Sequence, residues 1–316
     1  MKFVYVLTCD SVVDYAVQCY MSVWSLRYHN PGATVVLVTD EKTKSYLEKN
    51  YNILLDTVDT VKVVDVPESL SSKSRSRFIK TSLRQNIEGD FLYLDSDTVV
   101  AGGLDRLTHE PAHIAAVFDC NADGYPSRYM IEKLQSIGVD KFDDYVCYNG
   151  GIIKVKDTPE AHDFFYDWHE TWLDLREKYG MEIDQAAFLI ANRKNGNVIK
   201  ELSGIYNCQL PFPSSVRYFI DAKIIHYISD WDTDSSYPLK DTVLLHQIQK
   251  NGLDDKTKEI LVDPKTSFLS YNLILHKNDR ELYESPVSVL ARKISRDFPW
   301  TNKIVCMIYR IFGYEI

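Results

Sequence analysis

Two aspartates separated by one residue carry the most specific chemistry in the chain. Residues 91–94 are all apolar, and Asp95 and Asp97 follow them directly. The ligands of open α/β sheets lie at the carboxyl ends of the strands. Carboxylates two residues apart in an extended chain point the same way, about 7 Å apart. With a slight bend both can reach one hard cation, so the pattern predicts a metal site. A solvated acidic turn is the simpler alternative.

A histidine lies inside a later apolar segment. Ile224 to Ile228 reads as a short strand with His226 at its centre. A lone histidine in such a place is usually a core residue with its hydrogen bonds satisfied. As a third ligand beside two carboxylates, it would shift the preferred metal from Mg²⁺ towards Mn²⁺, because imidazole is softer than oxygen.

A run of basic residues precedes the aspartates. Between Ser71 and Ile87 the chain has no acidic residue and five basic ones: Lys73, Arg75, Arg77, Lys80 and Arg84. In a protein with a formal net charge of -9, this cluster is a candidate neighbour for a diphosphate. An arginine can bind phosphate through two parallel hydrogen bonds. The alternative is a solvated helix face.

Two further segments combine polar side chains with a turn or a helix start. Asn149 precedes Gly150 and Gly151, and paired glycines before an apolar segment suggest a close approach of backbone to ligand. An ordinary tight turn is the alternative. Asp184 and Gln185 begin a predicted helix, where the helix dipole favours an acid. Gln185 can offer both a donor and an acceptor to a sugar hydroxyl.

The elements that must position these residues alternate between strands and helices. Apolar runs predict strands over 3–8, 34–39, 61–66, 91–94, 114–118, 146–155 and 224–228. The pattern of apolar and polar residues predicts helices over 12–28, 42–49, 74–87, 159–178 and 183–193. Strands that are apolar on both faces and separated by helices indicate a largely parallel sheet covered on each side. The sequence therefore predicts an α/β fold of the nucleotide-binding type.

Composition excludes several other classes of protein. The negative net charge of the 316-residue chain argues against broad nucleic-acid binding, which needs a basic face. The six cysteines are scattered and form no C-x-x-C pair, so zinc-ribbon and redox motifs are absent. The apolar run at residues 3–7 is too short for a signal peptide, and no run approaches the ~18–20 residues of a membrane span. We expect a cytoplasmic protein.

Taken in order from Phe3 to about His226, these segments resemble glycosyltransferase family 8, a group of retaining enzymes. The resemblance implies the GT-A fold, a Rossmann-like α/β fold with a mostly parallel central sheet flanked by helices. It implies transfer of a hexose from a UDP-linked sugar to a glycan or glycolipid acceptor, with retention of anomeric configuration. It also implies dependence on Mn²⁺ or Mg²⁺.

The resemblance assigns the nucleotide side of the site residue by residue. Leu7-Thr8-Cys9-Asp10 is similar to the family's first strand and uridine-contacting loop, which implies that Thr8 and Asp10 lie near the nucleoside. Ser76-Arg77-Phe78-Ile79-Lys80 resembles the family's Tyr-x-Arg-Leu segment, which implies donor binding by Arg77 and Lys80.

It assigns the metal and sugar sides in the same way. Leu92-Tyr93-Leu94-Asp95-Ser96-Asp97 is similar to the metal-binding segment, with Ser96 among the donor-binding residues and with Asp95, Asp97 and His226 as ligands. Segments that resemble the family's remaining motifs place Asn149 near the donor sugar, place Asp184 and Gln185 close to its reactive carbon, and include Tyr206-Asn207.

One departure from the family and one competing motif leave two alternatives open. The family follows its histidine with a glycine and Lys-Pro-Trp, but here no lysine follows His226 until Lys240, which suggests a non-catalytic nucleotide-sugar binder. Asp95-Ser96-Asp97-Thr98 after an apolar strand also resembles the nucleophile signature of haloacid-dehalogenase-type phosphatases, which usually has one more residue before its Thr; there Asp95 would be the nucleophile and Asp97 the general acid. That motif opens its domain, whereas several strand–helix units precede it here, so we favour the glycosyltransferase.

The last part of the chain has a different character. We expect a GT-A domain over 1–262 and a helical extension over 263–316. From about Pro286 the extension interleaves apolar and aromatic residues with five basic ones: Arg292, Lys293, Arg296, Lys303 and Arg310. Helices of this type bind anionic headgroups, which predicts peripheral contact with the inner face of the membrane. A helix docked on the core is the alternative.

Overall fold

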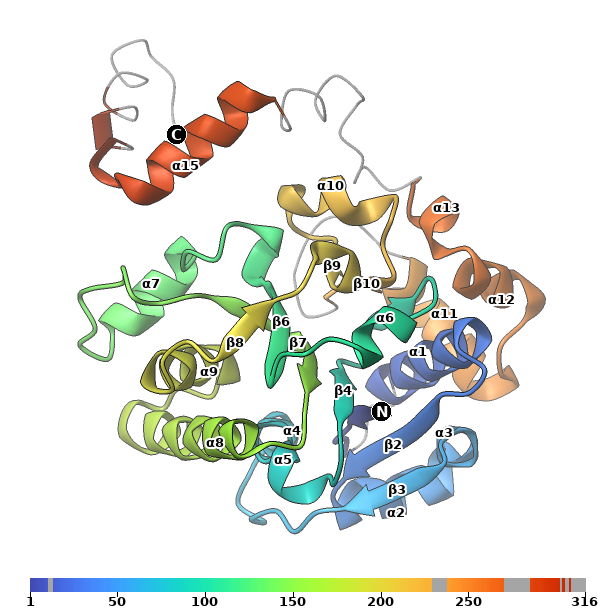
Figure 1. The fold of residues 1–316 in the computed structure, drawn as a ribbon. Helices are drawn as coiled ribbons and strands as arrows, with labels where there is room; N and C mark the ends of the chain where they lie inside the picture. Colours follow the sequence, from blue (N-terminus) through green and yellow to red (C-terminus); the bar gives the residue numbers. More distant parts are fainter. Residues whose placement is uncertain (11–13, 229–237, 270–284, 302, 305–306, 308–316) are drawn as a thin grey trace. The chain divides into compact units, whose positions relative to one another are not determined.

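The computed structural model describes residues 1–10, 14–228, 238–269, 285–301, 303–304 and 307 (Figure 1). Contacts divide the chain into two compact units, Met1–Leu273 and Ile274–Ile316. This division reflects packing and not function, so the functional boundary between residues 262 and 263 stays a prediction.

The first unit is built on a seven-stranded sheet with the order β3-β2-β1-β4-β7-β6-β8. In that order the strands are Thr60–Val63, Thr34–Thr39, Lys2–Val6, Phe91–Leu94, Tyr148–Val155, Ile114–Phe118 and Ile199–Glu201. The pairs β1–β2, β1–β4, β2–β3 and β6–β8 are parallel, and β7 alone runs antiparallel to its neighbours β4 and β6. The predicted mostly parallel sheet is confirmed.

Helices cover both faces of this sheet (Figure 1). Phe3 and Tyr5, the odd-numbered residues of β1, belong to the first core. The helices of this core are α1 (Asp14–His29), α2 (Glu41–Asn50), α3 (Asn52–Thr57), α11 (Thr242–Asn251), α12 (Asp255–Val262) and α13 (Pro264–Leu269). Val4 and Val6, the even-numbered residues of β1, belong to the second core. The helices of this core are α4 (Ser72–Thr81), α5 (Leu83–Asn86), α7 (Arg128–Gln135), α8 (Pro159–Tyr179) and α9 (Asp184–Lys194). Successive side chains of a strand point to opposite faces, so a strand buried on both sides must be apolar throughout.

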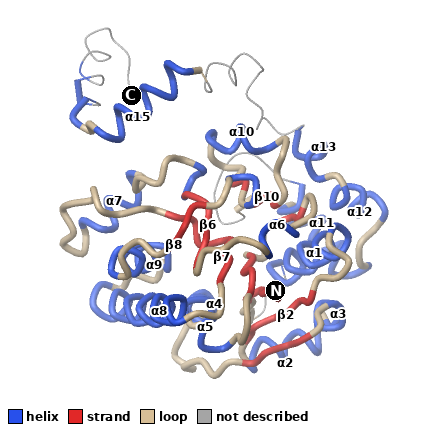
Figure 2. The backbone as a smooth tube through the Cα atoms, in the orientation of Figure 1, coloured by secondary structure: helices blue, strands red, loops and turns tan. Residues whose placement is uncertain are grey.

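A three-stranded sheet with the order β5-β10-β9 lies beside the large one (Figure 2). Its strands are Thr98–Val100, Ile224–His226 and Cys208–Gln209. The short helices α6 and α10, Asp105–Thr108 and Val216–Phe219, lie in the connections between strands. The turn at residues 95–97 joins β4 of the large sheet to β5 of the small one.

Five predicted elements are shorter or divided in the structure. The strand expected over 3–8 ends at Val6, and the one over 146–155 begins at Tyr148. The strand expected over 61–66 ends at Val63, and the one over 224–228 ends at His226. The helix expected over 74–87 is divided at Ser82, whose backbone is non-helical. The Ser82 hydroxyl donates to the Phe78 carbonyl at 2.8 Å and so competes with the helical hydrogen bonds.

In the second unit the described helix is α15, Pro286–Asp297. It begins at a capping serine, Ser285, whose hydroxyl accepts from the Ser288 N–H, and a proline follows at its first position. A helical C-terminal extension is therefore confirmed in its described part. Among the described residues, no helix has both the length and the apolar character to cross a membrane.

Candidate active site

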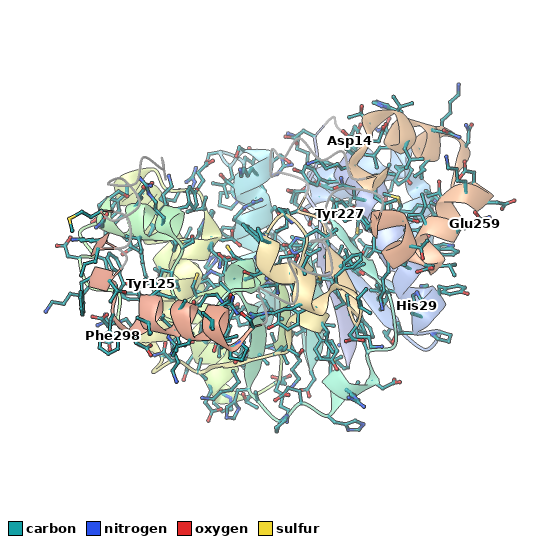
Figure 3. All side chains as sticks on the ribbon, turned by 90° about the horizontal axis from the view of Figure 1, so that it is seen from above. Asp14, His29, Tyr125, Tyr227, Glu259 and Phe298 are labelled. Carbon is teal, nitrogen blue, oxygen red and sulfur yellow. The ribbon has the colours of Figure 1, made fainter. Side chains whose placement is uncertain are left out.

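The acidic turn is anchored to both sheets. The N–H of Asp95 donates to the Gly151 carbonyl at 2.8 Å, and the Thr98 hydroxyl donates to the Asp95 carbonyl, also at 2.8 Å. On the other side, the N–H of Tyr227 donates to the Asp97 carbonyl at 3.2 Å. Tyr227, labelled in Figure 3, is fully buried. Because these bonds fix the backbone, the two carboxylates leave the turn in defined directions.

Asp95, Asp97 and His226 converge on one point. One ligand atom from each lies within 4.8 Å of the others. The Nε2 atom of His226 is 3.2 Å from the Asp97 carboxylate and 4.0 Å from the Asp95 carboxylate. Two carboxylates and an imidazole suit a divalent ion such as Mn²⁺. By this chemistry the residues present fit the metal that the sequence predicts.

Gly151 of β7 leaves the space in which these side chains meet. A Cβ atom there would lie 2.4 Å from Cε1 of His226, 2.8 Å from Oδ2 of Asp95 and 2.9 Å from Oδ1 of Asn149. At Gly150 the nearest atom, on Gln185, would be 3.5 Å away, which is ordinary contact. The close approach that the paired glycines suggested is therefore required at Gly151 only.

The carboxylates favour positive charge at this point. Burial alone would lower the pKa of His226, but the Asp97 carboxylate, helped by Asp95, raises that pKa above its ordinary value. The same two carboxylates would also attract a bound cation.

Lys80 lies buried between two carboxylates. Its ammonium is 3.3 Å from Oδ1 of Asp95 and 3.2 Å from Oδ2 of Asp184. The Tyr93 hydroxyl also donates to Oδ1 of Asp95. Burial would lower the pKa of Lys80, but Asp184 and Asp95 raise it overall. Burial would likewise raise the pKa of Asp184, yet Lys80 and Arg77 lower it. Asp184 is thereby held as a carboxylate.

The five residues of the basic run have different roles. Lys73, Arg77 and Lys80 line the same cavity as the acidic turn. Arg75 is 5% exposed and pairs with Asp10 and Asp40. Arg84 is 1% exposed and donates to the carbonyls of Ile87 and Gly89. Arg75 and Arg84 therefore stabilise the fold, and the other three basic residues of the run line the cavity.

Two of the predicted sugar-side residues, Gln185 and Asn149, are fixed by hydrogen bonds to neighbouring groups. Gln185 accepts from the Gly150 N–H at 3.3 Å and donates to the Tyr148 carbonyl. Asn149 donates to Oδ1 of Asp119 at 3.0 Å.

Asp119 is a residue that the sequence did not single out. It follows β6, and the next two residues, Cys120 and Asn121, have positive φ values of 58° and 49°. Burial raises the pKa of Asp119 above its usual value. No local motif marks this carboxylate, because the pairing of β6 with β7, in which Phe118 lies opposite Tyr148, brings it to Asn149.

One cavity of about 700 Å³ collects the predicted site residues except Asp10. Thr8 lines it, and its hydroxyl donates to the Ser72 carbonyl at 2.7 Å. Asp10 instead pairs with Lys42 and Arg75, each at 2.8 Å, and the pairing with Lys42 lowers the pKa of its carboxyl. Its nucleoside contact stays a prediction, and the neighbouring residues 11–13 lie outside the described part of the chain.

No protein-family model and no curated protein matches the chain. Solved glycosyltransferase structures do match it, at low identity. GlyE from Streptococcus pneumoniae TIGR4 is 18% identical over 85% of this chain and 64% of its own, with a TM-score of 0.50. The galactosyltransferase LgtC, solved with donor and acceptor sugar analogs, is 15% identical over 82% of this chain and 99% of its own, with a TM-score of 0.51. The bifunctional WbbM is 17% identical over 72% of this chain and 45% of its own, with a TM-score of 0.50.

These similarities define the class of fold. The chain has the GT-A glycosyltransferase fold, with its mixed α/β architecture and mostly parallel sheet. It spans less than two thirds of the length of GlyE.

Proposed function

We propose that this protein is a metal-dependent glycosyltransferase that moves a hexose from a UDP-linked sugar to a glycan or glycolipid acceptor, as in glycosyltransferase family 8. One observation carries the proposal. Asp95, Asp97 and His226 converge in the cavity that also holds Arg77 and Lys80. That cavity lies where β4 ends, which is the edge of an open α/β sheet at which ligands bind.

The charge of the site matches a nucleotide diphosphate as leaving group. Breaking the bond between the anomeric carbon and the diphosphate oxygen leaves negative charge on the nucleotide. A divalent ion held by Asp95, Asp97 and His226 would supply Lewis-acid stabilisation of that charge. Arg77 and Lys73 add fixed positive charge from α4, which needs no rearrangement during the reaction.

Among routes that retain the anomeric configuration, the contacts of the sugar-side residues favour front-face attack over double displacement. A double displacement needs a free nucleophile near the anomeric carbon. Asp184 is paired through one oxygen to Lys80 and through the other to Arg77 at 3.8 Å. The amide of Gln185 is bound to backbone atoms of β7. In the front-face route the acceptor oxygen bonds to the anomeric carbon as the diphosphate leaves. The departing phosphate oxygen takes the acceptor's proton.

Two other functions are less well supported. A phosphatase of the dehalogenase type needs Asp95 as nucleophile, but its Oδ1 already accepts from Tyr93 and pairs with Lys80. The GT-A fold of the chain also favours sugar transfer. A non-catalytic binder was suggested by the segment after His226, of which residues 229–237 lie outside the described chain. Turnover separates it from an enzyme.

A screen of nucleotide sugars for Mn²⁺-dependent release of nucleoside diphosphate tests the proposal. We expect release from a UDP-sugar, loss of release in chelator, and a fall in kcat/KM of at least about 100-fold in Asp97→Ala. Asp105→Ala, an exposed acid of α6, is the matched control and should behave as the parent. Equal turnover by Asp97→Ala in chelator and by the metal-loaded parent would refute the metal-dependent mechanism.

The stereochemistry of the product tests the mechanism separately. Proton NMR of the transferred sugar should show the anomeric configuration of the donor. An inverted product would exclude both the front-face route and the resemblance to family 8.

We also propose that α15 binds the surface of an anionic membrane, at the inner face in a cytoplasmic setting. Val287, Leu290 and Ile294 recur at helical spacing and are exposed. Arg292 and Arg296 come from other positions of the helix and supply charge for anionic headgroups.

A further inference from the structure

A row of side-chain amides lies behind His226. The Nδ1 atom of His226 is 3.1 Å from Oδ1 of Asn207, and Asn207 is fully buried just before β9. Nδ2 of Asn207 donates to Oδ1 of Asn149 at 2.9 Å. Nδ2 of Asn149 in turn donates to Oδ1 of Asp119 at 3.0 Å. The row therefore connects the Asp119 carboxylate to the imidazole that faces the acidic turn.

The direction of every bond in this row follows from one backbone group. The Gly151 N–H, which can only donate, lies 2.9 Å from the Asn149 side chain, so the atom facing it must be the oxygen Oδ1. The same oxygen faces Asn207, so Asn207 must present its Nδ2 there. The other atom of the Asn207 amide, Oδ1, then faces His226 and can only accept. This arrangement requires a proton on Nδ1 of His226.

We propose that Asn207 is a positioning residue that holds His226 in the tautomer whose Nε2 lone pair faces Asp95 and Asp97. The inference rests on the proposed metal site, in which neutral Nε2 would be a ligand. A histidine ligand usually donates its other ring N–H to a partner that fixes both the tautomer and the orientation of the ring. Here the partner is an amide instead of a carboxylate.

The surroundings of Asn207 suit this role. Its backbone carbonyl accepts from Nδ2 of Asn121 at 2.9 Å, so the main chain is fixed as well as the amide. Reversing the amide would place its NH₂ group against Nδ1 and its oxygen against that of Asn149, which already accepts from Gly151. This reversal would leave the oxygens of Asn207 and Asn149 facing each other with no donor between them, so the row has one stable orientation.

A double-mutant cycle on Mn²⁺ affinity tests the proposal. The affinity for Mn²⁺ alone, with no nucleotide, is measured from the electron paramagnetic resonance signal of the free ion. The proteins compared are the full-length parent, Asn207→Leu, His226→Gln and the double variant. Leu matches Asn in size but cannot accept a hydrogen bond. A residue that acts through His226 must lose its effect when His226 is replaced.

We expect Asn207→Leu to lower Mn²⁺ affinity about 10- to 100-fold in the parent. In the His226→Gln background, Asn207→Leu should lower Mn²⁺ affinity about threefold or less. Asn207→Ala also removes the acceptor for the Nδ1 proton, without adding apolar atoms, and should lower the Mn²⁺ affinity of the parent in the same range as Asn207→Leu. Asn192→Leu is the matched control, because Asn192 is also fully buried but lies away from the cavity in α9. It should leave Mn²⁺ affinity unchanged.

Two outcomes would overturn the inference. These are an unchanged affinity in Asn207→Leu, or an equal loss in both backgrounds. If Asn207→Leu does not fold, the same comparison with Asn207→Ala in the parent and in His226→Gln decides whether the inference stands. Failure of the proposed function looks different: the parent then binds Mn²⁺ and gives the expected cycle but consumes no nucleotide sugar. A parent that binds no Mn²⁺ refutes both.

Discussion

At the scale of single residues, the space at Gly151 is as important to the site as the charged groups. His226, Asp95 and Asn149 come from three different strands or their ends, and all three lie within 2.9 Å of the point that a Cβ atom at residue 151 would occupy. Any larger residue would have to displace a proposed metal ligand or the amide row behind it. The glycine therefore acts by leaving space and not by its backbone freedom.

Gly151→Ala is expected to damage the site and the fold together. Its methyl group would lie 2.4 Å from the imidazole of His226, so the ring must move. We expect the free energy of unfolding to fall by about 1–3 kcal/mol, as for other overpacked cores. Mn²⁺ affinity should fall as well. Urea unfolding in chelator and Mn²⁺ titration measure the two effects.

Gly150→Ala is the control for this experiment, because its Cβ would meet nothing closer than 3.5 Å. It should retain the Mn²⁺ affinity of the parent. If the two alanine variants bound Mn²⁺ equally well, the ligands would tolerate the methyl group and the close packing at Gly151 would have no role in the site.

Much of the site could be predicted from the sequence because its residues lie in recognisable local patterns. Asp95 and Asp97 follow an apolar strand, and Arg77 and Lys80 lie in a basic run, so both sets could be located before the structure was known. Asp119 could not, because its bond to Asn149 depends on the pairing of β6 with β7. Arg75 pairs with Asp10 and Asp40, whereas Arg77 lines the cavity, and this difference also depends on tertiary contacts.

At the scale of elements, Asp157 joins three parts of the second core. It lies between β7 and α8, accepts from His162 of α8, and accepts from the N–H of Gly89 before β4 at 2.6 Å. Arg84 of α5 is 3.4 Å away. The hydrogen bond from His162 is the main cause that lowers the Asp157 pKa from its usual value of 3.8 to about 2.

Asp157→Asn should lower the free energy of unfolding near neutral pH, and progressively less as the pH falls below about 4. A carboxyl group whose pKa is lower in the folded state stabilises the fold above its unfolded pKa, near 3.8. That stabilisation is lost as pH falls towards about 2. We expect the parent to be more stable than Asp157→Asn at pH 5 to 7, about 1 to 3 units above the unfolded pKa, and the difference to shrink below pH about 4.

Urea unfolding at a series of pH values measures this difference. Asp163→Asn, in the same helix α8, is the control and should show no comparable change with pH. A difference between parent and Asp157→Asn that stays constant from pH about 5 to about 2 would contradict the assignment to this carboxylate.

Two long elements were predicted closely, although the ten-residue helix α11 was missed and the three-residue strand β10 was found from its apolar run. Strand β2 and the long helix α8 agree with the sequence to within a residue. The strands β5, β8 and β9, with two or three residues each, were missed because so short a segment has no periodicity. Their existence depends on pairing with distant partners. The break at Ser82 depends on a side-chain hydrogen bond and not on a helix-breaking residue.

At the scale of the whole molecule, the prediction concerns membrane binding through α15. The full chain should bind vesicles that contain phosphatidylglycerol and not vesicles of pure phosphatidylcholine. Replacing Arg292, Lys293 and Arg296 by Gln should weaken binding by about 100-fold, at about 1 kcal/mol per basic residue. Cosedimentation measures it, and added salt should weaken binding by the full chain.

The matched control replaces three lysines of the first unit, Lys250, Lys256 and Lys258, in the same way. It should retain vesicle binding. Binding of the α15 triple variant as strong as that of the parent would exclude the electrostatic contact and leave the docked helix as the interpretation of this segment.

The turn at residues 95–97 has a consequence for the order in which the protein matures. All seven strands of the large sheet are encoded before residue 202, whereas Thr98 pairs with His226 much later in the chain. Contacts between residues so far apart form late, since closing the long loop between them costs entropy. A nascent chain on the ribosome can thus pair the strands of its large sheet while the acidic turn still has no histidine beside it. A product terminated before β10 would have all the strands of that sheet, but neither the histidine of the proposed metal site nor the part of the first core that α11, α12 and α13 supply.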